Sequence, residues 1–384
     1  MTETKAYGTW PSPITPERLT EAQVGLGPVT IDDGQIYWLE SRPNEGGRTV
    51  VVRLRADGRP EDDLTPMPFN VRTRVHEYGG GAFAARGGIL LATNFSDQRL
   101  YRLEPGRSPV ALTPECRAML RFADHAIDTA RGIAFAVRED HRGDGEAVNT
   151  IVRLDVEGPE NEGVIVASGH DFFAAPRLSP DGKQLAFISW DHPNMPWDST
   201  TLWLADVGEA GWLSNVRPIA GGDGVSVMQP CFSPGGSLYY VSDQTGWWNV
   251  YRLDPNQRDA DAIHPLAAEF AVPAWSFGQS TYGFLRDEHM IAAYVQNGRW
   301  HLSLIDEASG QSTVIDLPYT SMSSLSIEDG DVVMRVGAPD RPAAIIALDP
   351  ESGRHRVLKT SGTLSISPEL ISVPEPIAFP LEKR

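Results

Sequence analysis

Short apolar segments alternate with polar turns along almost the whole chain, and the clearest example lies near its middle. FFAAPRLSP (Phe172–Pro180) predicts a strand, Asp181-Gly182 predicts a hairpin turn, and QLAFISW (Gln184–Trp190) predicts a second strand. TTLWLADV (Thr200–Val207) and NVRPIA (Asn215–Ala220) then predict a third and a fourth strand. The pattern is typical of a four-stranded antiparallel meander.

The same plan recurs about seven times, in units of roughly 50 residues, which is the range of a propeller blade. One strand of each unit ends in a similar way, at Leu54, Leu103, Leu154, Leu204, Leu253, Ile305 and Leu348. The 30 prolines and 36 glycines are spread among the units and are not pooled in a linker. The sequence therefore predicts an all-β fold, a seven-bladed β-propeller of four-stranded antiparallel blades over residues 24–370, after a lead-in over residues 1–23.

Successive connections of an antiparallel meander lie at opposite rims. Loops between second and third strands share one rim with the crossovers between blades, and we call it the crossover rim. The hairpin turns between first and second strands share the other, the tight-turn rim. Four polar segments are expected on the crossover rim: Arg72–Gly81, Arg138–Arg142, Asp191–Asp198 and Asp243–Asn249. Because binding residues concentrate on loops held by a rigid scaffold, we expect the functional site there.

Charge and composition exclude several classes of function. The formal net charge of −18 disfavours binding to nucleic acid or to anionic lipid, because both require clustered Lys and Arg. The N-terminal sequence MTETKAYGTW does not have the form of a signal peptide, and no apolar run is long enough to cross a bilayer. The two cysteines, Cys116 and Cys231, are far apart and are expected to be buried free thiols. We therefore expect a cytoplasmic protein without nucleic-acid or membrane partners.

Motifs for catalysis are not found in the sequence. Gly278–Gly283 (GQSTYG) is one residue longer than a G-x-S-x-G nucleophile elbow and lies inside a predicted blade. His76-Glu77 lacks the second histidine of H-E-x-x-H, and the other histidines show no ligand spacing within one element. No catalytic residue, metal ion or cofactor is therefore expected, although a metal at the propeller axis could draw ligands from several blades.

Several long, irregular strings resemble those of one known family. They are ESRPNEGGR (Glu40–Arg48), RTRVHEYGGGAF (Arg72–Phe83), NFSDQRLYRL (Asn94–Leu103), WDHPNMPWD (Trp190–Asp198), SDQTGWWNVYRL (Ser242–Leu253) and WSFGQSTYGFL (Trp275–Leu285). Together they resemble the N-terminal propeller of the prolyl oligopeptidase family of serine peptidases, in its acylaminoacyl-peptidase or dipeptidyl-aminopeptidase-like branch. The resemblance covers the chain from about Tyr7 to Pro380.

The resemblance implies a two-part enzyme in which the propeller covers the mouth of an α/β-hydrolase domain. In the family, that domain follows the propeller and carries the catalytic Ser, Asp and His. Residues 371–384 look like a truncated leader toward it, and the chain stops at Arg384. A hydrolase domain needs on the order of a couple of hundred residues. We therefore expect the chain alone to be inactive, with a peptide substrate and a hydrolase domain as its partners.

The resemblance also implies substrate contacts on the crossover rim. The matching residues are Arg72, Arg74, His76, Glu77, His192, Asn194 and Trp197. Alternatives remain for some of them. Glu77 could simply pair with Arg72 or Arg74, and Trp197, Trp247 and Trp248 could either form a binding platform or pack between sheets. In the lead-in, Trp10 and Ile14 are expected to be exposed and to contact the hydrolase domain.

Three functions remain open at this stage. The chain could be the substrate-gating propeller of a serine peptidase, a free-standing propeller that serves as a protein or peptide binding scaffold, or a propeller enzyme with a metal at its axis. The retained strings and the leader favour the first.

Overall fold

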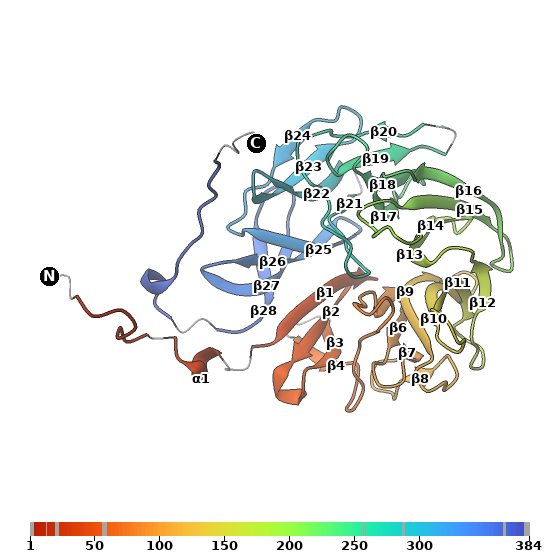
Figure 1. The fold of residues 1–384 in the computed structure, drawn as a ribbon, viewed down its shortest axis with the longest axis horizontal. Coiled ribbons are helices and arrows are strands. Elements are labelled where there is room, and N and C mark those ends of the chain that lie inside the picture. Colours follow the sequence, from red (N-terminus) through yellow and green to blue (C-terminus); the bar gives the residue numbers. More distant parts are fainter. Residues whose placement is uncertain are drawn as a thin grey trace.

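The computed structural model confirms a ring of seven antiparallel sheets, each with four strands that are consecutive in sequence (Figure 1). It describes residues 4–12, 14–19, 23–55, 60–255, 257, 259–285, 289–363 and 366–379. The first residues of the expected lead-in, 1–3, and the last residues of the expected leader, 380–384, lie outside this part. Within it, no helix has the length and the apolar character needed to cross a membrane.

The first four blades follow the predicted units. Blade 1 consists of β1 (Gly25–Asp32), β2 (Gln35–Arg42), β3 (Arg48–Leu54) and β4 (Pro60–Asp63), and blade 2 of β5 (Phe83–Arg86), β6 (Ile89–Thr93), β7 (Leu100–Leu103) and β8 (Val110–Ala111). Blade 3 consists of β9 (Leu120–Asp128), β10 (Ile133–Asp140), β11 (Val148–Asp155) and β12 (Val164–Ala167). Blade 4 consists of β13 (Phe172–Leu178), β14 (Gln184–Trp190), β15 (Thr201–Val207) and β16 (Leu213–Gly221).

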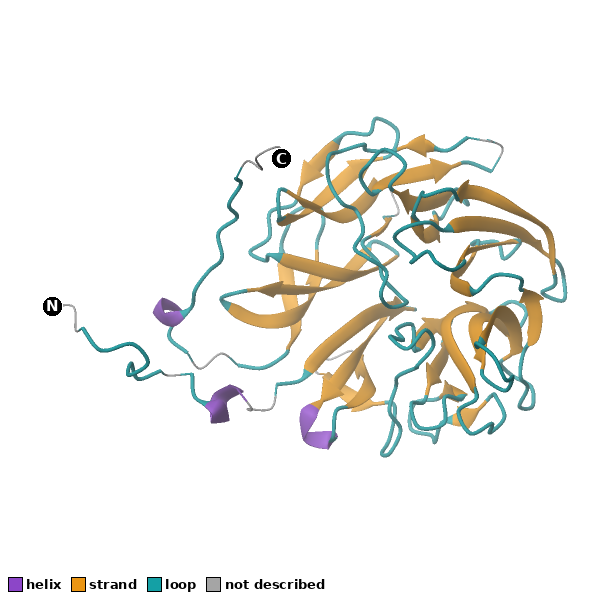
Figure 2. Cartoon of the chain, viewed as in Figure 1, coloured by secondary structure: helices purple, strands orange, loops and turns teal. Residues whose placement is uncertain are grey.

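Three more blades complete the ring. Blade 5 consists of β17 (Val227–Phe232), β18 (Leu238–Ser242), β19 (Asn249–Leu253) and β20 (Asp261–Ala262). Blade 6 consists of β21 (Tyr282–Phe284), β22 (His289–Gln296), β23 (Arg299–Asp306) and β24 (Ser312–Val314). Blade 7 consists of β25 (Ser321–Glu328), β26 (Asp331–Ala338), β27 (Arg341–Leu348) and β28 (His355–Thr360). Three short helices, α1 (Pro16–Leu19), η1 (Pro43–Glu45) and η2 (Pro368–Leu370), are drawn purple in Figure 2.

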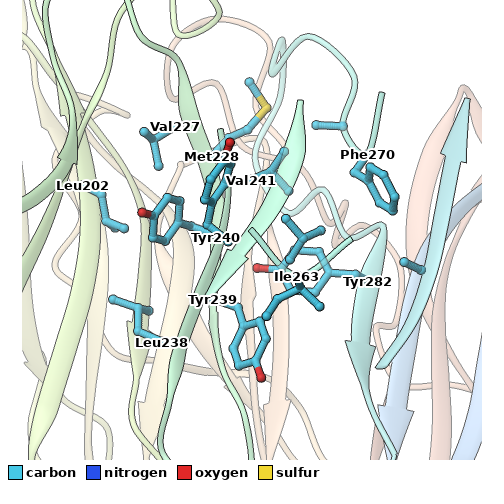
Figure 3. Close-up of a cluster of buried hydrophobic side chains, with 14 of the residues drawn as sticks. Leu202, Val227, Met228, Leu238, Tyr239, Tyr240, Val241, Ile263, Phe270 and Tyr282 are labelled. Carbon is cyan, nitrogen blue, oxygen red and sulfur yellow. The ribbon is translucent and has the colours of Figure 1, made fainter. Parts of the chain in front are cut away.

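Apolar contacts between neighbouring sheets hold the ring together. Separate buried clusters lie between blades 1 and 2, 2 and 3, 3 and 4, 6 and 7, and 7 and 1, and a larger one joins blades 4, 5 and 6. Figure 3 shows the larger cluster, where Tyr239, Tyr240 and Tyr282 lie among aliphatic side chains. Because inner strands are covered on both faces, they read as nearly continuous apolar runs, as β10 (IAFAVRED) does.

The ring closes without exchange of a strand between its first and last blades. Backbone N–H groups of β1 donate to side chains of β25, from Val29 to Ser324 Oγ (2.8 Å) and from Ile31 to Ser326 Oγ (3.0 Å). Arg335 Nη1 donates to the carbonyl of Leu26 (2.8 Å). These side-chain contacts, together with the apolar cluster around Trp38, replace the backbone ladder that a shared sheet would provide.

Both terminal segments leave the ring at the crossover rim. β1 begins and β28 ends there, and the N–H of Val24 donates to the carbonyl of Ser361 (2.9 Å). Beyond this bond the two segments extend away from the blades (Figure 1). Anything joined to either end therefore starts from this rim.

Candidate functional site

The two longest crossovers, residues 64–82 and 263–281, meet over the ring axis. The N–H of Phe277 donates to the carbonyl of Gly79 (2.9 Å), and Gly80 forms a parallel bridge with Phe277. These crossovers lead into blades 2 and 6, which are not neighbours, so the contact spans the ring. Gly79, Gly80 and Gly81 all have positive φ, and a Cβ on Gly80 would lie 3.0 Å or less from atoms of Ser276 and Phe277. The three glycines thus permit this close backbone approach.

Beside this crossing lies a cavity of about 470 Å³, which we call the rim cavity. It is lined by residues 76–78, by residues between 139 and 149, by 171–172, by residues between 190 and 197, and by 274–275. Its size is in the range of small-ligand sites. Five predicted site residues meet here: His76, Glu77, His192, Asn194 and Trp197. They come from two crossover-rim loops that are more than a hundred residues apart in the sequence.

Carboxylates dominate the charge of the rim cavity. Glu77, Glu139, Glu146 and Asp171 line it, and no lysine or arginine is among its described lining residues. Behind the wall, Arg121 Nη1 contacts both Glu77 Oε1 (3.0 Å) and Glu139 Oε2 (3.1 Å). Because one guanidinium serves two carboxylates, this pair retains net negative charge. The Glu77 side chain is 76% exposed, and it is the carboxylate of the pair that a ligand can reach.

Glu139 organises the wall next to His76. Its Oε1 accepts the backbone N–H of His76 (3.1 Å), and its Oε2 lies 2.7 Å from His141 Nε2. The Glu139 side chain is almost fully buried, so these contacts offset its loss of hydration. His76 and Glu77 both have left-handed backbone conformations, with φ of 53° and 63°. Such strain in consecutive non-glycine residues persists where surrounding contacts enforce it, as at binding sites.

The imidazole of His76 is neutral at physiological pH. Burial among Phe172, Trp190 and Phe277 lowers its pKa to about 4, and nearby Glu139 only partly offsets the effect. Nε2 lies 3.2 Å from Asn149 Oδ1, which fits an Nε2–H donor. His76 therefore serves as an uncharged wall of the cavity, and Glu77 and Glu139 supply its charge.

The opposite side of the cavity is built by two crossed pairs between the start of β13 and the end of β14. His192 Nδ1 lies 2.9 Å from Asp171 Oδ2, and His170 Nδ1 lies 2.8 Å from Asp191 Oδ2. The backbone N–H of His192 also donates to Asp171, and these bonds lower the pKa of the Asp171 carboxyl. Asn194 donates its backbone N–H to the carbonyl of Asp191 (3.0 Å), which shapes the loop.

Arg72 and Arg74 lie outside the lining of the rim cavity. Both guanidinium groups lie over the ring of Phe95, at 4.5 and 5.2 Å from its centroid. Arg72 lines a separate cavity of about 300 Å³ between blades 1 and 2. The suggested pairing of Glu77 with Arg72 or Arg74 is wrong, because Glu77 Oε1 pairs with Arg121 Nη1 on β9 at 3.0 Å.

Of the three tryptophans considered from sequence, one lines the cavity. Trp197 contacts Trp275 with ring centroids 4.5 Å apart, and Trp275 contacts Tyr78 at 5.0 Å. Trp248 packs against the core between blades, as the packing alternative predicts. Trp247 is 43% exposed and lies outside the cavity.

Among the residues that the structure describes, one group of acidic side chains is close enough to hold a metal ion, and it lies on the tight-turn rim. Ligand atoms of Asp32, Asp33 and Glu328 lie within 4.8 Å of one another. However, Asp32 already accepts the N–H groups of Gly87 (2.6 Å) and Gly88 (2.9 Å). Its buried carboxylate thus has a structural role in fixing the hairpin turn of blade 2.

Comparisons with known proteins bear on the same architecture. No protein-family model matches the sequence, and no curated protein matches it. Among solved structures, puromycin hydrolase is 32% identical over 96% of this chain, with a TM-score of 0.88. A puromycin-hydrolyzing peptidase from Mycobacterium tuberculosis is 33% identical over 94% of this chain, with a TM-score of 0.86. Prolyl oligopeptidase B from Galerina marginata, at 16% identity and a TM-score of 0.65, shares the fold over 90% of this chain.

The two puromycin-hydrolysing proteins are similar to this chain over at least 94% of its length. The chain matches the propeller domain of the prolyl oligopeptidase family. It spans 58%, 57% and 52% of the length of the three matched proteins. The likeness therefore concerns the propeller, and it places no catalytic group on a residue of this chain.

Several residues at the rim cavity were not predicted from the sequence. Asn149 and, behind the cavity wall, Arg121 are common residue types in ordinary strands, and nothing marks them in the sequence. Tyr78 lies inside the predicted rim segment Arg72–Gly81, but no role was predicted for it. Glu139 and His141 lie inside the predicted rim segment Arg138–Arg142, so the rim was identified but not their role. Trp275 begins one of the strings that carried the resemblance, which was the available signal for it.

Proposed function

We propose that this chain is the non-catalytic, substrate-gating propeller of a serine peptidase, and that its rim cavity binds the free N-terminal amine of a short peptide. The observation that carries the proposal is the unbalanced pair of carboxylates, Glu77 and Glu139, in a cavity on the rim from which both terminal segments leave. Arg121 provides one positive charge for two carboxylates. An ammonium group placed there supplies the second.

The position of the terminal segments supports a hydrolase domain over this rim. They carry exposed apolar side chains, including Trp10 (55%), Ile14 (43%), Ile377 (81%) and Phe379 (74%). Exposed apolar groups of this density favour contact with a further protein surface. Loops of the crossover rim are short in blades 6 and 7, at residues 297–298 and 339–340, and the C-terminal segment leaves from blade 7. A domain that follows residue 361 would find space there and face the rim cavity.

The charge of the cavity also bears on the branch of the family. A dipeptidyl-aminopeptidase-like substrate has a charged terminal amine, whereas an acylaminoacyl-peptidase substrate has a neutral, blocked one. Because carboxylates surround the cavity, the proposal favours the unblocked terminus. The two free cysteines, Cys116 and Cys231, fit a cytoplasmic compartment, which we propose as its location.

A second function, a free-standing propeller that binds peptides or proteins, is favoured by one observation. All seven blades are complete, and the ring is closed by its own contacts between β1 and β25. The rim cavity could then bind a ligand without a catalytic partner.

The test combines the encoding DNA with an activity assay. The reading frame that contains codons 1–384 is sequenced beyond Arg384, and its full product and the chain itself are assayed with matched aminoacyl and N-acetylaminoacyl anilides and with puromycin. We expect a serine-directed inhibitor to abolish hydrolysis by the full product, and we expect the free-amine substrate to be preferred. Glu77→Gln should reduce this preference, because Glu77 is the carboxylate of the pair that a ligand can reach.

Two outcomes would overturn the proposal. A reading frame that ends at Arg384, with no hydrolase encoded nearby, would favour the free-standing scaffold. Hydrolysis by residues 1–384 alone, insensitive to serine-directed inhibitors, would mean that the chain has chemistry of its own.

A further inference from the structure

Three aromatic side chains from three separate loops form a continuous contact at the rim cavity. Tyr78 comes from the crossover before β5, Trp197 from the loop between β14 and β15, and Trp275 from the crossover before β21. The ring centroids are 5.0 Å apart for Tyr78 and Trp275 and 4.5 Å apart for Trp275 and Trp197. We call these three residues the aromatic ladder. All three line the rim cavity.

The ladder is more exposed than aromatic residues that serve only for packing. Tyr78 is 65% exposed and Trp275 is 49% exposed, although each already contacts another ring. In contrast, Trp38 of the blade core is fully buried. A side chain that only joined blades would bury its ring as Trp38 does. The exposed ring faces of the ladder therefore remain open to a ligand.

A second aromatic surface lines the same cavity. Phe172 and Trp190 are stacked, with centroids 5.2 Å apart and planes 16° from parallel. His192 contacts Phe172 at 5.0 Å, and neutral His76 contacts both rings of the stack, at 5.1 and 5.4 Å. The rim cavity thus has aromatic walls from β13 and β14 of blade 4 and from the ladder, whose Tyr78 and Trp275 come from crossovers to other blades.

The carboxylates and the aromatic walls are joined through residues 76–78. Glu77 is flanked by His76, whose ring contacts the stacked pair, and by Tyr78, which belongs to the ladder. Glu139 fixes this segment by accepting the N–H of His76. A ligand whose ammonium lies at Glu77 and Glu139 therefore has aromatic surface within reach of a side chain on the adjacent carbon.

From this arrangement we infer that the rim cavity selects peptides and aminoacyl amides whose N-terminal residue is aromatic. The ring of that residue stacks on Trp275 and the neighbouring rings, and its α-ammonium lies at the carboxylates. This inference deepens the proposed function, because the same cavity holds the amine. Aromatic pairs are stabilised by ring geometry in addition to buried area, so an aromatic ligand should bind more tightly than an aliphatic one of similar size.

The experiment measures binding of small amides to the chain by titration calorimetry. The ligands are L-phenylalaninamide, L-leucinamide and N-acetyl-L-phenylalaninamide. We expect phenylalaninamide to bind about tenfold more tightly than leucinamide. Trp275→Leu should remove this difference, and Trp275→Phe should retain most of it. Trp247→Leu is the matched control, because Trp247 is a similarly exposed tryptophan outside the cavity.

Circular dichroism and thermal unfolding check that each variant is folded. If Trp275→Leu does not fold, Tyr78→Leu provides the same test from another loop. Equal affinity for phenylalaninamide and leucinamide, a difference that persists in the folded ladder variant, or no measurable binding of either amide would each overturn the inference.

The acetylated ligand separates this inference from the proposed function. If N-acetylphenylalaninamide binds as tightly as phenylalaninamide, while leucinamide binds weakly, the amine site is wrong and the aromatic subsite stands. If both free amides bind equally and acetylation abolishes binding, the amine site stands and the aromatic subsite is wrong.

Discussion

Asp124 on β9 and Arg177 on β13 form an ion pair across the boundary between blades 3 and 4, with 2.8 Å between Oδ1 and Nη1. The other carboxylate oxygen of Asp124 accepts the backbone N–H of Ala175 (2.8 Å). Asp124 has a positive φ of 53° and Ala175 one of 52°. The pair therefore combines backbone strain with a contact between blades.

The same arrangement recurs around the axis. Gln229 and Ser324 also have φ of 53°, and each accepts a backbone N–H from the next blade, from Thr281 (3.0 Å) and from Val29 (2.8 Å). All four residues lie where the register of the innermost strand shifts against its neighbour. We call Asp124, Ala175, Gln229 and Ser324 the collar. A bulge at this level turns a polar group toward the adjacent blade, and so links sheets that share no ladder.

Replacement of Asp124 by Asn should destabilise the propeller by about 1–3 kcal/mol, because it leaves Arg177 without its charge partner. The lower end of this range is expected, since the Arg177 side chain is 31% exposed and water can reach it. Arg177 and His125 both line a cavity of about 470 Å³ between the innermost strands of the blades, which we call the axial channel. Urea unfolding gives the change. Asp124→Asn combined with Arg177→Met should recover part of the loss. A double variant less stable than the sum of the single variants would contradict this explanation.

A feature of this molecule can be predicted from the sequence when the residues that determine it are close together along the chain. The strands of blade 4 were predicted within a few residues, because local alternation and the Asp181-Gly182 turn are visible in sequence. The collar was not predicted, because Asp124, Ala175 and Gln229 are not glycines, and the contacts that accompany their positive φ are made with an adjacent blade. In the site, the rim loops were placed correctly by meander geometry. The pairing of Glu77 with Arg121, which joins a crossover to a distant strand, has no local signal.

Ser324→Ala should loosen the closure between blades 7 and 1. The N–H of Val29 would lose its acceptor, and an unsatisfied, partly buried N–H costs about 1–2 kcal/mol. We expect faster hydrogen exchange at Val29 and Ile31, together with a lower urea midpoint. Ser321→Ala is the control, since Ser321 is an exposed serine on the same strand. Equal exchange in both variants would mean that apolar packing alone closes the ring.

His125 should make stability depend on pH between about 4 and 6.5. Burial in the axial channel lowers its pKa to about 4, against about 6.5 in an unfolded chain. In this window the unfolded state binds a proton that the folded state does not, so stability falls as the pH falls from 6.5 to 4 and is constant above 6.5 as far as this group is concerned. The loss is about 2–3 kcal/mol.

Unfolding of wild type and His125→Asn at several pH values measures this contribution. The difference in unfolding free energy between the two proteins should change across the window in favour of the variant at low pH. His76, whose pKa is also lowered to about 4 by burial, remains in the variant and should preserve part of the acid sensitivity. A constant difference from pH 7 to pH 4 would show that His125 has the same pKa in the folded and the unfolded state.

Gly80→Ala tests whether the two long crossovers must touch for the rim cavity to form. Gly80 has a φ of 92°, and an added Cβ would lie 2.6 Å from the backbone nitrogen of Phe277. Gly88 provides the matched control, because it has a φ of 77° and nothing lies within 4 Å of its Cβ position. An alanine at positive φ costs about 1–2 kcal/mol by itself, and Gly88→Ala should show only that loss. Gly80→Ala should lose about 1–2 kcal/mol more, because the clash separates residues 79–80 from Phe277.

Since Trp275 and Tyr78 flank this contact, ligand binding in the rim cavity should weaken in Gly80→Ala and remain unchanged in Gly88→Ala. Equal unfolding free energies and equal ligand affinities in the two variants would mean that the crossovers hold their positions independently, and that the cavity does not depend on their contact.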